Sequence, residues 1–403
     1  MDLDDPTRTE PATDPAASPG SRHDTPAPRE GEPLRQDKYA VPTGRQPLTP
    51  IVKPLPPDLF VVHGSTAETR WESMRGQGLH TPNDRFFVRN HTGTPLIDAE
   101  RWRLRLHGSG LREPLALTYG DLLSLGSATA DVAIECAGNG RSLFASQQGT
   151  PAPGVPWRLG GVGVARWHGV PLRTVLELAG VTEDAVDVMP RGLDAPYVED
   201  GVDHGRVRRP LPVAKAMDDV LIAFEMNGRT LPPDHGFPAR LVVPGWSGIA
   251  SIKWLGDIEV STTPLTSPWN TRFYRLFGPG HAEGGDPLTV QGVRSAFELP
   301  WEATLPAGRQ VLHGRSWSGR GRVVEVEVSA DGGGTWARAR ARVPRRPGVW
   351  TRWEFAWTPP GPGAYVLMAR ATDETGARQP DAAAFNTLGY QFGGVVRHPV
   401  TVV

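Results

Sequence analysis

Cysteine is almost absent from this chain, because Cys136 is the only one in 403 residues. A single thiol cannot form an internal disulfide or build a multi-cysteine zinc site, so a functional Cys136 has to be one soft metal ligand or a nucleophile. Taken by itself, a free cysteine is more often a buried structural residue. Which of these interpretations applies to Cys136 depends on the residues around it.

Long apolar runs, lysine and excess charge are scarce as well. No uninterrupted apolar run of about 18 residues occurs, which argues against a membrane-spanning helix. The net charge of -1 and the sequence pI near 6.8 provide no overall field for nucleic acid or an anionic membrane. The start, Met1–Asp5, has neither a twin-arginine pair nor an apolar signal region. The predicted compartment is therefore the cytoplasm.

Glycine, proline and tryptophan are abundant, with 47, 41 and 13 residues, and they indicate many turns and strands. A length of 403 residues suggests two or three domains at about 150 residues each. Residues 1–48, rich in proline and acidic side chains, are predicted to be a disordered tail. Together with the local patterns described below, the sequence predicts a mixed α and β domain over residues 49–283 and a β-rich domain over residues 284–403.

Local patterns within residues 49–283 predict short elements of both kinds, hence an α+β body. Residues 65–68 have the form of a capping box that opens a short helix ending at Gly76. Residues 102–106 alternate like a strand. The apolar residues of 172–179 share one helical face that Gly180 would end. Residues 240–245 and 252–260 are typical of strands around a glycine-containing loop.

The pattern changes beyond about residue 285. Residues 324–328 alternate with a period of two, residues 331–333 supply a turn, and residues 336–341 resume the alternation. Residues 365–370 form another apolar run before a turn. Several short strands at this spacing predict a β-sandwich of immunoglobulin-like architecture.

The neighbours of Cys136 favour a functional role. The run is Ile-Glu-Cys-Ala-Gly-Asn-Gly-Arg over residues 134–141. Gly138 and Gly140 would let the backbone approach a bulky ligand, and Arg141 could hold the thiolate or bind an anionic group. A hydrolase would need a base beside the thiol, and no local signature favours one among the eleven histidines.

Two further segments carry cationic side chains beside glycine or aromatic residues. The first is Phe-Val-Arg-Asn-His at residues 87–91, which suits an anion or cofactor contact at a strand end. The second joins His235–Arg240 to Ser251–Lys253 around a Gly-Trp-Ser-Gly loop at residues 245–248, which could form a phosphate cradle. From the residues alone, ordinary strands with rim charges explain the second segment equally well.

Together these segments resemble the sulfite oxidase family of molybdenum cofactor enzymes. The resemblance covers about residues 50–403. It includes Phe-Phe-Val-Arg-Asn-His (residues 86–91), Glu-Cys-Ala-Gly-Asn-Gly-Arg (135–141), Asp-His-Gly-Phe-Pro (234–238), Lys-Trp-Leu (253–255) and Trp-Ser-Gly (317–319). The resemblance implies a molybdopterin-binding domain at residues 49–283 and an immunoglobulin-like dimerisation domain at residues 284–403, and thus a homodimer.

The resemblance also implies a cofactor site. Cys136 would be the one protein ligand to molybdenum, with a pterin dithiolene supplying further sulfur ligands, and thiolate is a suitable soft donor. The residues implied to hold the molybdenum-molybdopterin cofactor are Phe87, Val88, Arg89, Asn90, His91, Cys136, Asp194, His235, Arg240, Ser251, Ile252 and Lys253.

In the family the substrate pocket has two arginines, a tyrosine and a tryptophan, which match Arg89, Arg322, Tyr274 and Trp269. Converging guanidinium groups suit a small oxyanion such as sulfite. The implied reaction is oxidation of sulfite to sulfate by oxygen-atom transfer, with two electrons passing to a separate cytochrome, another acceptor or dioxygen. Residues 1–48 are too short and polar for the haem domain of animal members, and one cysteine forbids a Cys-x-x-Cys-His haem site. No haem is therefore expected in this chain.

Three alternatives remain open on the sequence. A nitrate reductase or an S-oxide reductase would use the same cofactor, although a pair of arginines suits a compact dianion better than a neutral sulfoxide. The third alternative is a non-catalytic binding or scaffold protein with an empty cofactor cleft. The thiol and the basic residues argue against it, because a scaffold does not require them.

Overall fold

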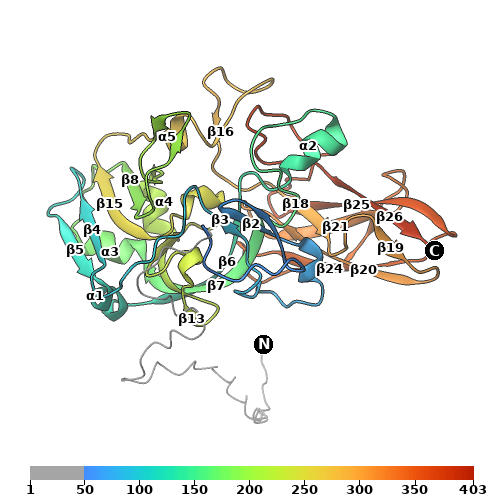
Figure 1. The fold of residues 1–403 in the computed structure, drawn as a ribbon, viewed down its shortest axis with the longest axis horizontal. Helices are drawn as coiled ribbons and strands as arrows, with labels where there is room; N and C mark the ends of the chain where they lie inside the picture. The colour runs from blue at the N-terminus through green and yellow to red at the C-terminus, as the bar shows by residue number, and fades with distance from the viewer. Residues whose placement is uncertain (1–49) are drawn as a thin grey trace, which may run out of the picture. The chain divides into compact units, whose positions relative to one another are not determined.

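The computed structural model describes residues 50–403, and Figure 1 shows its fold. The tail predicted for residues 1–48 lies outside the described residues. The first part of the described chain is a mixed α and β body with three sheets, and the last part consists of two sheets. The predicted α+β class is therefore confirmed. Among residues 50–403, no helix is long and apolar enough to cross a membrane.

Two five-stranded sheets form the centre of the first part (Figure 1). The first has the order β11 (Leu211–Pro212), β8 (Asp187–Gly192), β15 (Leu255–Ser261), β4 (Arg103–His107) and β5 (Leu115–Thr118). The second has the order β13 (Arg229–Thr230), β12 (Leu221–Met226), β7 (Val162–Pro171) and β6 (Ala128–Glu135), and β14 (Arg240–Val242) also pairs with β12. All these pairings are antiparallel except that of β15 with β4.

The remaining elements of the first part are short. The helices are α1 (Tyr119–Ser124), α2 (Arg141–Gln148), α3 (Leu172–Leu178), α4 (Val213–Asp218) and α5 (Pro268–Thr271). The 3-10 helices are η1 (Trp71–Met74), η2 (Pro233–His235) and η3 (Gly248–Ala250). A third sheet contains β1 (Phe60–His63), β2 (Thr66–Thr69) and β3 (Val88–Arg89), and two ribbons pair β9 (Val198–Glu199) with β10 (Val202–Asp203) and β16 (Arg275–Leu276) with β17 (Asp286–Pro287).

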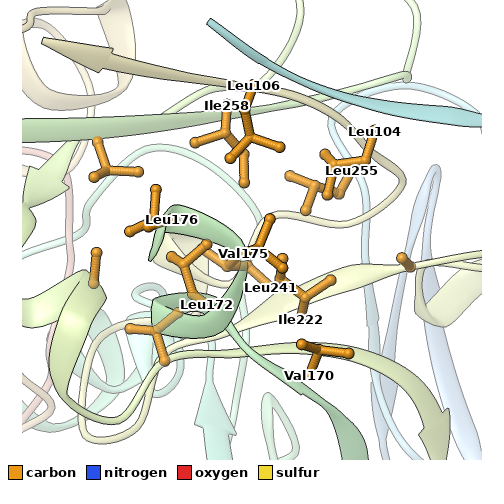
Figure 2. Close-up of a cluster of buried hydrophobic side chains, with 14 of the residues drawn as sticks. Leu104, Leu106, Val170, Leu172, Val175, Leu176, Ile222, Leu241, Leu255 and Ile258 are labelled. Carbon is orange, nitrogen blue, oxygen red and sulfur yellow. The ribbon is translucent and has the colours of Figure 1, made fainter. Parts of the chain in front are cut away.

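Helix α3 joins the two large sheets through its apolar face. Leu172, Val175 and Leu176 are buried, and Gly180 follows the helix with a φ of 69°, which glycine adopts without strain. Figure 2 shows these side chains between Leu106 and Ile258 of one sheet and residues of the other. The helix predicted from the 3.6-residue period is confirmed.

The helix predicted to open at residues 65–68 is wrong. Thr66–Thr69 is the strand β2, which pairs with β1 and β3. All four residues are buried, and sheet pairing satisfies their backbone groups. Glu68 accepts hydrogen bonds from the backbone N–H groups of Arg158 and Gly160 instead of capping a helix. Tertiary pairing therefore overrides the local capping pattern.

The last part of the chain forms the predicted immunoglobulin-like sandwich. One sheet has the order β18 (Arg294–Phe297), β20 (Gln310–Trp317), β24 (Thr351–Trp357) and β23 (Arg340–Arg342). The other has the order β19 (Ala303–Leu305), β26 (Val396–Val402), β25 (Gly363–Asp373), β21 (Val323–Ser329) and β22 (Ala337–Arg338). Alternate residues of these strands, among them Phe297, Val326 and Leu367, form a common apolar core.

A separate cluster of buried side chains joins the two parts of the described chain. Phe144 of α2 packs with Phe392, and Trp71 of η1 packs with Trp317 and Trp350. These contacts hold β20 and the segment around residue 392 against the Cys136 segment. The sandwich is therefore placed to contribute to a site at Cys136.

Candidate active site

A cavity opens where β6 ends and the chain turns into α2. Its walls include most of the residues predicted to hold the cofactor or the substrate: Phe87, Arg89, Asn90, His91, Cys136, Asp194, His235, Arg240, Ser251, Ile252, Lys253 and Tyr274. These residues come from six separate segments of the chain. The fold therefore brings together in one place what the sequence holds far apart.

Cys136 lies in the wall of this cavity, buried at 8% exposure. Its N–H donates to the Gly161 carbonyl at 2.8 Å, and its own carbonyl accepts from Asn139 N–H at 2.9 Å. A side chain at position 138 would meet the Arg141 guanidinium at 2.8 Å, so Gly138 allows that arginine to pack against the loop. The loop thus holds one thiol in a fixed backbone setting.

Burial raises the pKa of the Cys136 thiol, while Arg89, the Gly138 N–H and Arg141 act in the opposite direction. The thiol therefore stays protonated unless another positive centre displaces the proton. A metal ion is such a centre, because thiolate is the form that binds metals. The setting suits a ligand better than a free nucleophile.

His91, Tyr274 and Trp269 form a hydrogen-bonded group beside Arg89. His91 Nε2 lies 3.4 Å from Trp269 Nε1 and 3.2 Å from the Tyr274 hydroxyl. An indole N–H only donates, so His91 Nε2 is the acceptor. Burial, Arg89 and Lys253 lower the pKa of His91 well below its usual value. His91 is therefore neutral and holds the tryptophan and the tyrosine in place.

Arg89 ends β3 and lies in the cavity wall with His91 and Tyr274. Burial opposes its charge, but neighbouring groups that ionise at high pH, namely Tyr274, Cys136, Tyr390 and Tyr197, raise the pKa of its guanidinium. Burial also raises the pKa of Tyr274, so that hydroxyl stays protonated. The cavity wall beside Cys136 thus presents one fixed positive charge and one hydroxyl donor.

Basic residues gather at the other end of the cavity. Lys253 donates to the Asn90 side-chain oxygen and to the Asp234 carbonyl, and Arg240 donates to the carbonyls of His235 and Ser251 at 2.9 and 3.0 Å. Burial lowers the pKa of Lys253 well below its usual value and that of Arg240 to about 9. A bound anion would reverse these shifts, because opposite charge favours the protonated forms.

The residues of the cavity fit a phosphate-bearing pterin with a metal at its far end. Two buried polar atoms in the wall, His235 Nε2 and Asp194 Oδ1, have no hydrogen-bond partner within the described chain. A buried polar atom of this kind needs a partner such as a bound group or a water molecule, and a pterin in the cavity would provide one. Burial raises the pKa of Asp194 to about 6, because its ionised carboxylate loses contact with water. A hydrogen-bond donor on a bound group would stabilise that carboxylate.

Three of the predicted residues do not line the cavity among residues 50–403. Val88 belongs to a small apolar core with Phe60. Trp269 is fully buried behind the wall and reaches the cavity only through His91. The third residue, Arg322, is a larger departure.

Arg322 does not join the arginine-tyrosine group. Its side chain is 37% exposed and pairs with Glu374 at 2.8 Å. The pairing of β21 with β25 sets Val323 opposite Asp373, so Arg322 and Glu374 emerge side by side. The expectation that Arg322 lines the cavity with Arg89 therefore does not match the structure.

Two other residues stand close to the site but were not among the predicted ones. Arg141 donates to the carbonyls of Gly389 and Val155, and its guanidinium lies 5.3 Å from the centre of the Tyr390 ring. Tyr390 stacks on Tyr274 with ring centres 5.2 Å apart. The Cys136 motif pointed to Arg141, but no sequence signal pointed to Tyr390, which the sandwich contributes.

Comparison with known proteins agrees with this geometry. The family model "Oxidoreductase molybdopterin binding domain" matches residues 91–269, and "Mo-co oxidoreductase dimerisation domain" matches residues 296–397. Both matches fall within the domains predicted from the sequence, whose boundaries at residues 48 and 283 stay predictions.

This chain is similar to several proteins, among them two relatives and one solved structure. Sulfite oxidase of Gallus gallus is 36% identical over 75% of this chain and 69% of its own length. Nitrate reductase [NADH] of Ulva prolifera is 31% identical over 83% of this chain and 42% of its own. The crystal structure of the sulfane dehydrogenase SoxCD from Paracoccus pantotrophus is 29% identical, with a TM-score of 0.72 and 91% of each chain covered.

The chain spans 58% of the length of the mitochondrial sulfite oxidases that it matches. The two family-model matches nevertheless cover residues 91–269 and 296–397. This chain therefore belongs to the sulfite oxidase family of molybdenum cofactor oxidoreductases.

Proposed function

We propose that this protein is a molybdenum-dependent oxidoreductase that oxidises sulfite to sulfate and has Cys136 as the protein ligand to the metal. The observation that carries the proposal is the position of the chain's single thiol, which shares one cavity wall with Arg89 and Tyr274. A soft ligand, a fixed cation and a hydroxyl donor are what a small sulfur oxyanion at a molybdenum centre requires.

The basic end of the cavity would hold the cofactor. Lys253 and Arg240 would turn from backbone carbonyls toward the phosphate, and His235 Nε2 and Asp194 Oδ1 would gain partners on the pterin. Ser251 and Ile252 line the same cavity. When bound, the molybdenum cofactor supplies oxygen-atom transfer and accepts two electrons.

The chain's own residues would bind and orient sulfite. Arg89 would donate charge-assisted hydrogen bonds to the sulfite oxygens, and the neutral Tyr274 hydroxyl would turn its one proton from His91 to a sulfite oxygen. His91 Nε2 would keep its hydrogen bond from Trp269 and hold the Tyr274 hydroxyl in position when sulfite is absent. In the overall reaction sulfite gains one oxygen that derives from water, and two electrons and two protons leave the site.

The electrons would pass to a separate protein, such as a cytochrome, or to another acceptor including dioxygen. The match of residues 296–397 to a dimerisation domain supports a homodimer formed through the sandwich.

A second candidate is oxidation of sulfane sulfur. The observation that favours it is the pairing of Arg322 with Glu374, which leaves one of the two expected arginines beside Cys136 and Tyr274. A site with one arginine is less selective for the compact sulfite dianion, and the similar structure is that of a sulfane dehydrogenase. Nitrate, a monoanion, stays a third substrate for the same test.

The test measures molybdenum and pterin in purified holoprotein and then adds sulfite, thiosulfate and nitrate in turn, the last to dithionite-reduced enzyme. The Mo(V) electron paramagnetic resonance signal reports each reaction. We expect sulfite to reduce the metal at the lowest concentration, and Cys136→Ser to lose molybdenum. Reduction by thiosulfate alone, or reoxidation by nitrate without any reduction by sulfite, would replace sulfite as the substrate. Full molybdenum content in Cys136→Ser would contradict the ligand assignment.

A further inference from the structure

Glu135, directly before Cys136, is hydrogen-bonded by residues of the sandwich and so connects the sandwich to the loop that follows β6, residues 136–140, here called the cysteine loop. Its buried carboxylate accepts three side-chain hydrogen bonds, from Asn139 at 2.8 Å, Arg294 at 2.5 Å and Trp317 at 2.9 Å. Arg294 lies on β18 and Trp317 on β20, so two of the three donors come from the sandwich. Both carboxylate oxygens therefore have a hydrogen-bond donor.

Arg294 also binds the far side of the same loop. Its Nη1 donates to the Asn139 carbonyl at 2.9 Å, while Asn139 N–H donates to the Cys136 carbonyl at 2.9 Å. One guanidinium nitrogen therefore connects the residue before Cys136 with the residue three positions after it. A side chain at position 140 would come within 2.5 Å of Arg294 Nη2. The absence of a side chain at Gly140 therefore allows the guanidinium of Arg294 to pack against the loop.

Two further hydrogen bonds reach backbone carbonyls on either side of Cys136 from the last part of the chain. Gln391 N–H donates to the Ala137 carbonyl at 2.7 Å, and the Gln291 amide donates to the Ala133 carbonyl at 3.3 Å. Cys136 therefore lies between residues that are each fixed by groups more than 150 positions away in the chain. The setting of its side chain depends on the sandwich as much as on β6.

Stability alone does not explain a buried ion pair here. The side chains of Arg294 and Glu135 are 5% and 6% exposed, and at such burial the loss of hydration offsets most of the attraction between the charges. Apolar residues of equal volume would stabilise the fold as well. What the ion pair adds is a fixed geometry, because charge-assisted hydrogen bonds are short and directional.

We propose that Arg294 and Trp317 are positioning residues of the active site, which act through Glu135 to set the orientation of Cys136 toward the metal. The inference rests on the proposed role of Cys136 as the molybdenum ligand. It assigns the sandwich a part in the chemistry besides any part in dimer formation. Outer contacts of this kind orient metal ligands and tune the metal in other proteins.

The test removes the ion pair without leaving a buried charge. In the variant Glu135→Gln/Arg294→Met, glutamine still accepts from Trp317, and methionine fills the space of the arginine stem. We expect its unfolding temperature to return close to the wild-type value, whereas Arg294→Met alone unfolds earlier because Glu135 is left unpaired. In the double variant we expect an altered Mo(V) signal, a shifted molybdenum reduction potential and kcat lower by roughly 10- to 100-fold.

The matched control is Glu298→Gln/Arg315→Met, which removes the other buried ion pair of the sandwich. Arg315 binds Glu298 and backbone carbonyls of residues 74–78, away from the cysteine loop. Because Arg315 also donates to three backbone carbonyls, this control should lower the unfolding temperature, but it should change neither the Mo(V) signal nor the potential. Arg294→Lys, which keeps the charge, should restore part of the signal.

A double variant with wild-type stability, signal and potential would overturn the positioning role, as would a control that changes the signal equally. Failure of the ligand assignment would appear separately, as molybdenum retained in Cys136→Ser. The two failures are therefore distinguishable.

Discussion

Replacement of Arg89 tests the substrate site most directly. Glutamine at position 89 removes the positive charge beside Cys136 and Tyr274 but keeps a donor for the Asn90 carbonyl, which Arg89 Nη1 contacts. A hydrogen bond to a charged group contributes about 1.5–3 kcal/mol. With about 1.4 kcal/mol for each factor of ten, Arg89→Gln should raise the KM for sulfite by about 10- to 150-fold.

The assay is steady-state sulfite oxidation with an artificial electron acceptor, on samples normalised for molybdenum. Arg89 is expected to bind the ground state and the transition state alike, so kcat should change less than KM. Arg89→Lys keeps the charge but not the forked geometry, and its KM should lie between those of wild type and Arg89→Gln. A KM within twofold of wild type in a fully loaded Arg89→Gln sample would refute the reasoning.

Three more outcomes follow from the structure. Arg322→Ala should leave the KM for sulfite unchanged, because this side chain pairs on the surface; a strong rise in KM would restore Arg322 to the substrate pocket. Asp194 has a folded pKa near 6, above its unfolded value of 3.8, so its ionisation destabilises the fold as pH rises through 4–6. Asp194→Asn should therefore raise the unfolding temperature at pH 7 and lose most of that advantage at pH 4, and an equal gain at both pH values would contradict this cause. Arg315→Met should lower the free energy of unfolding by about 3–5 kcal/mol because it leaves Glu298 buried and unpaired, whereas Arg338→Met, at an ion pair 81% exposed on the arginine side, should change it by less than about 1 kcal/mol in denaturant titrations.

The accuracy of the sequence predictions depended on how local their physical cause is. The helix over residues 172–178 follows from the positions of Leu172, Val175 and Leu176 alone, and it forms as expected. The alternation over residues 102–106 predicts a strand in the same way, and the strand forms over residues 103–107. The capping pattern at residues 65–68 failed because its backbone groups pair with β1 and β3, which no short window of sequence contains.

The site shows the same division. Cys136 with its glycines, the segment 87–91 and the basic residues 235–253 are contiguous motifs whose residue types state their chemistry, and they meet in one cavity. Arg322 was expected beside them, yet the position of its side chain depends on the pairing of β21 with β25. That pairing sets Val323 opposite Asp373, and it brings Glu374, the residue after β25, next to Arg322. The sequence does not reveal this pairing.

The sequence by itself indicated the kind of cofactor, through the family resemblance that its motifs carry, and it named most of the residues that line the cavity, because a lone thiol and basic side chains keep their chemistry wherever the chain folds. Only the tertiary structure decided which groups surround that thiol. Arg294, Trp317 and Tyr390 reach the site from the sandwich, and their contacts are set by strand pairing and by packing between the two parts of the chain. Such contacts join residues distant in sequence, and no local pattern encodes them.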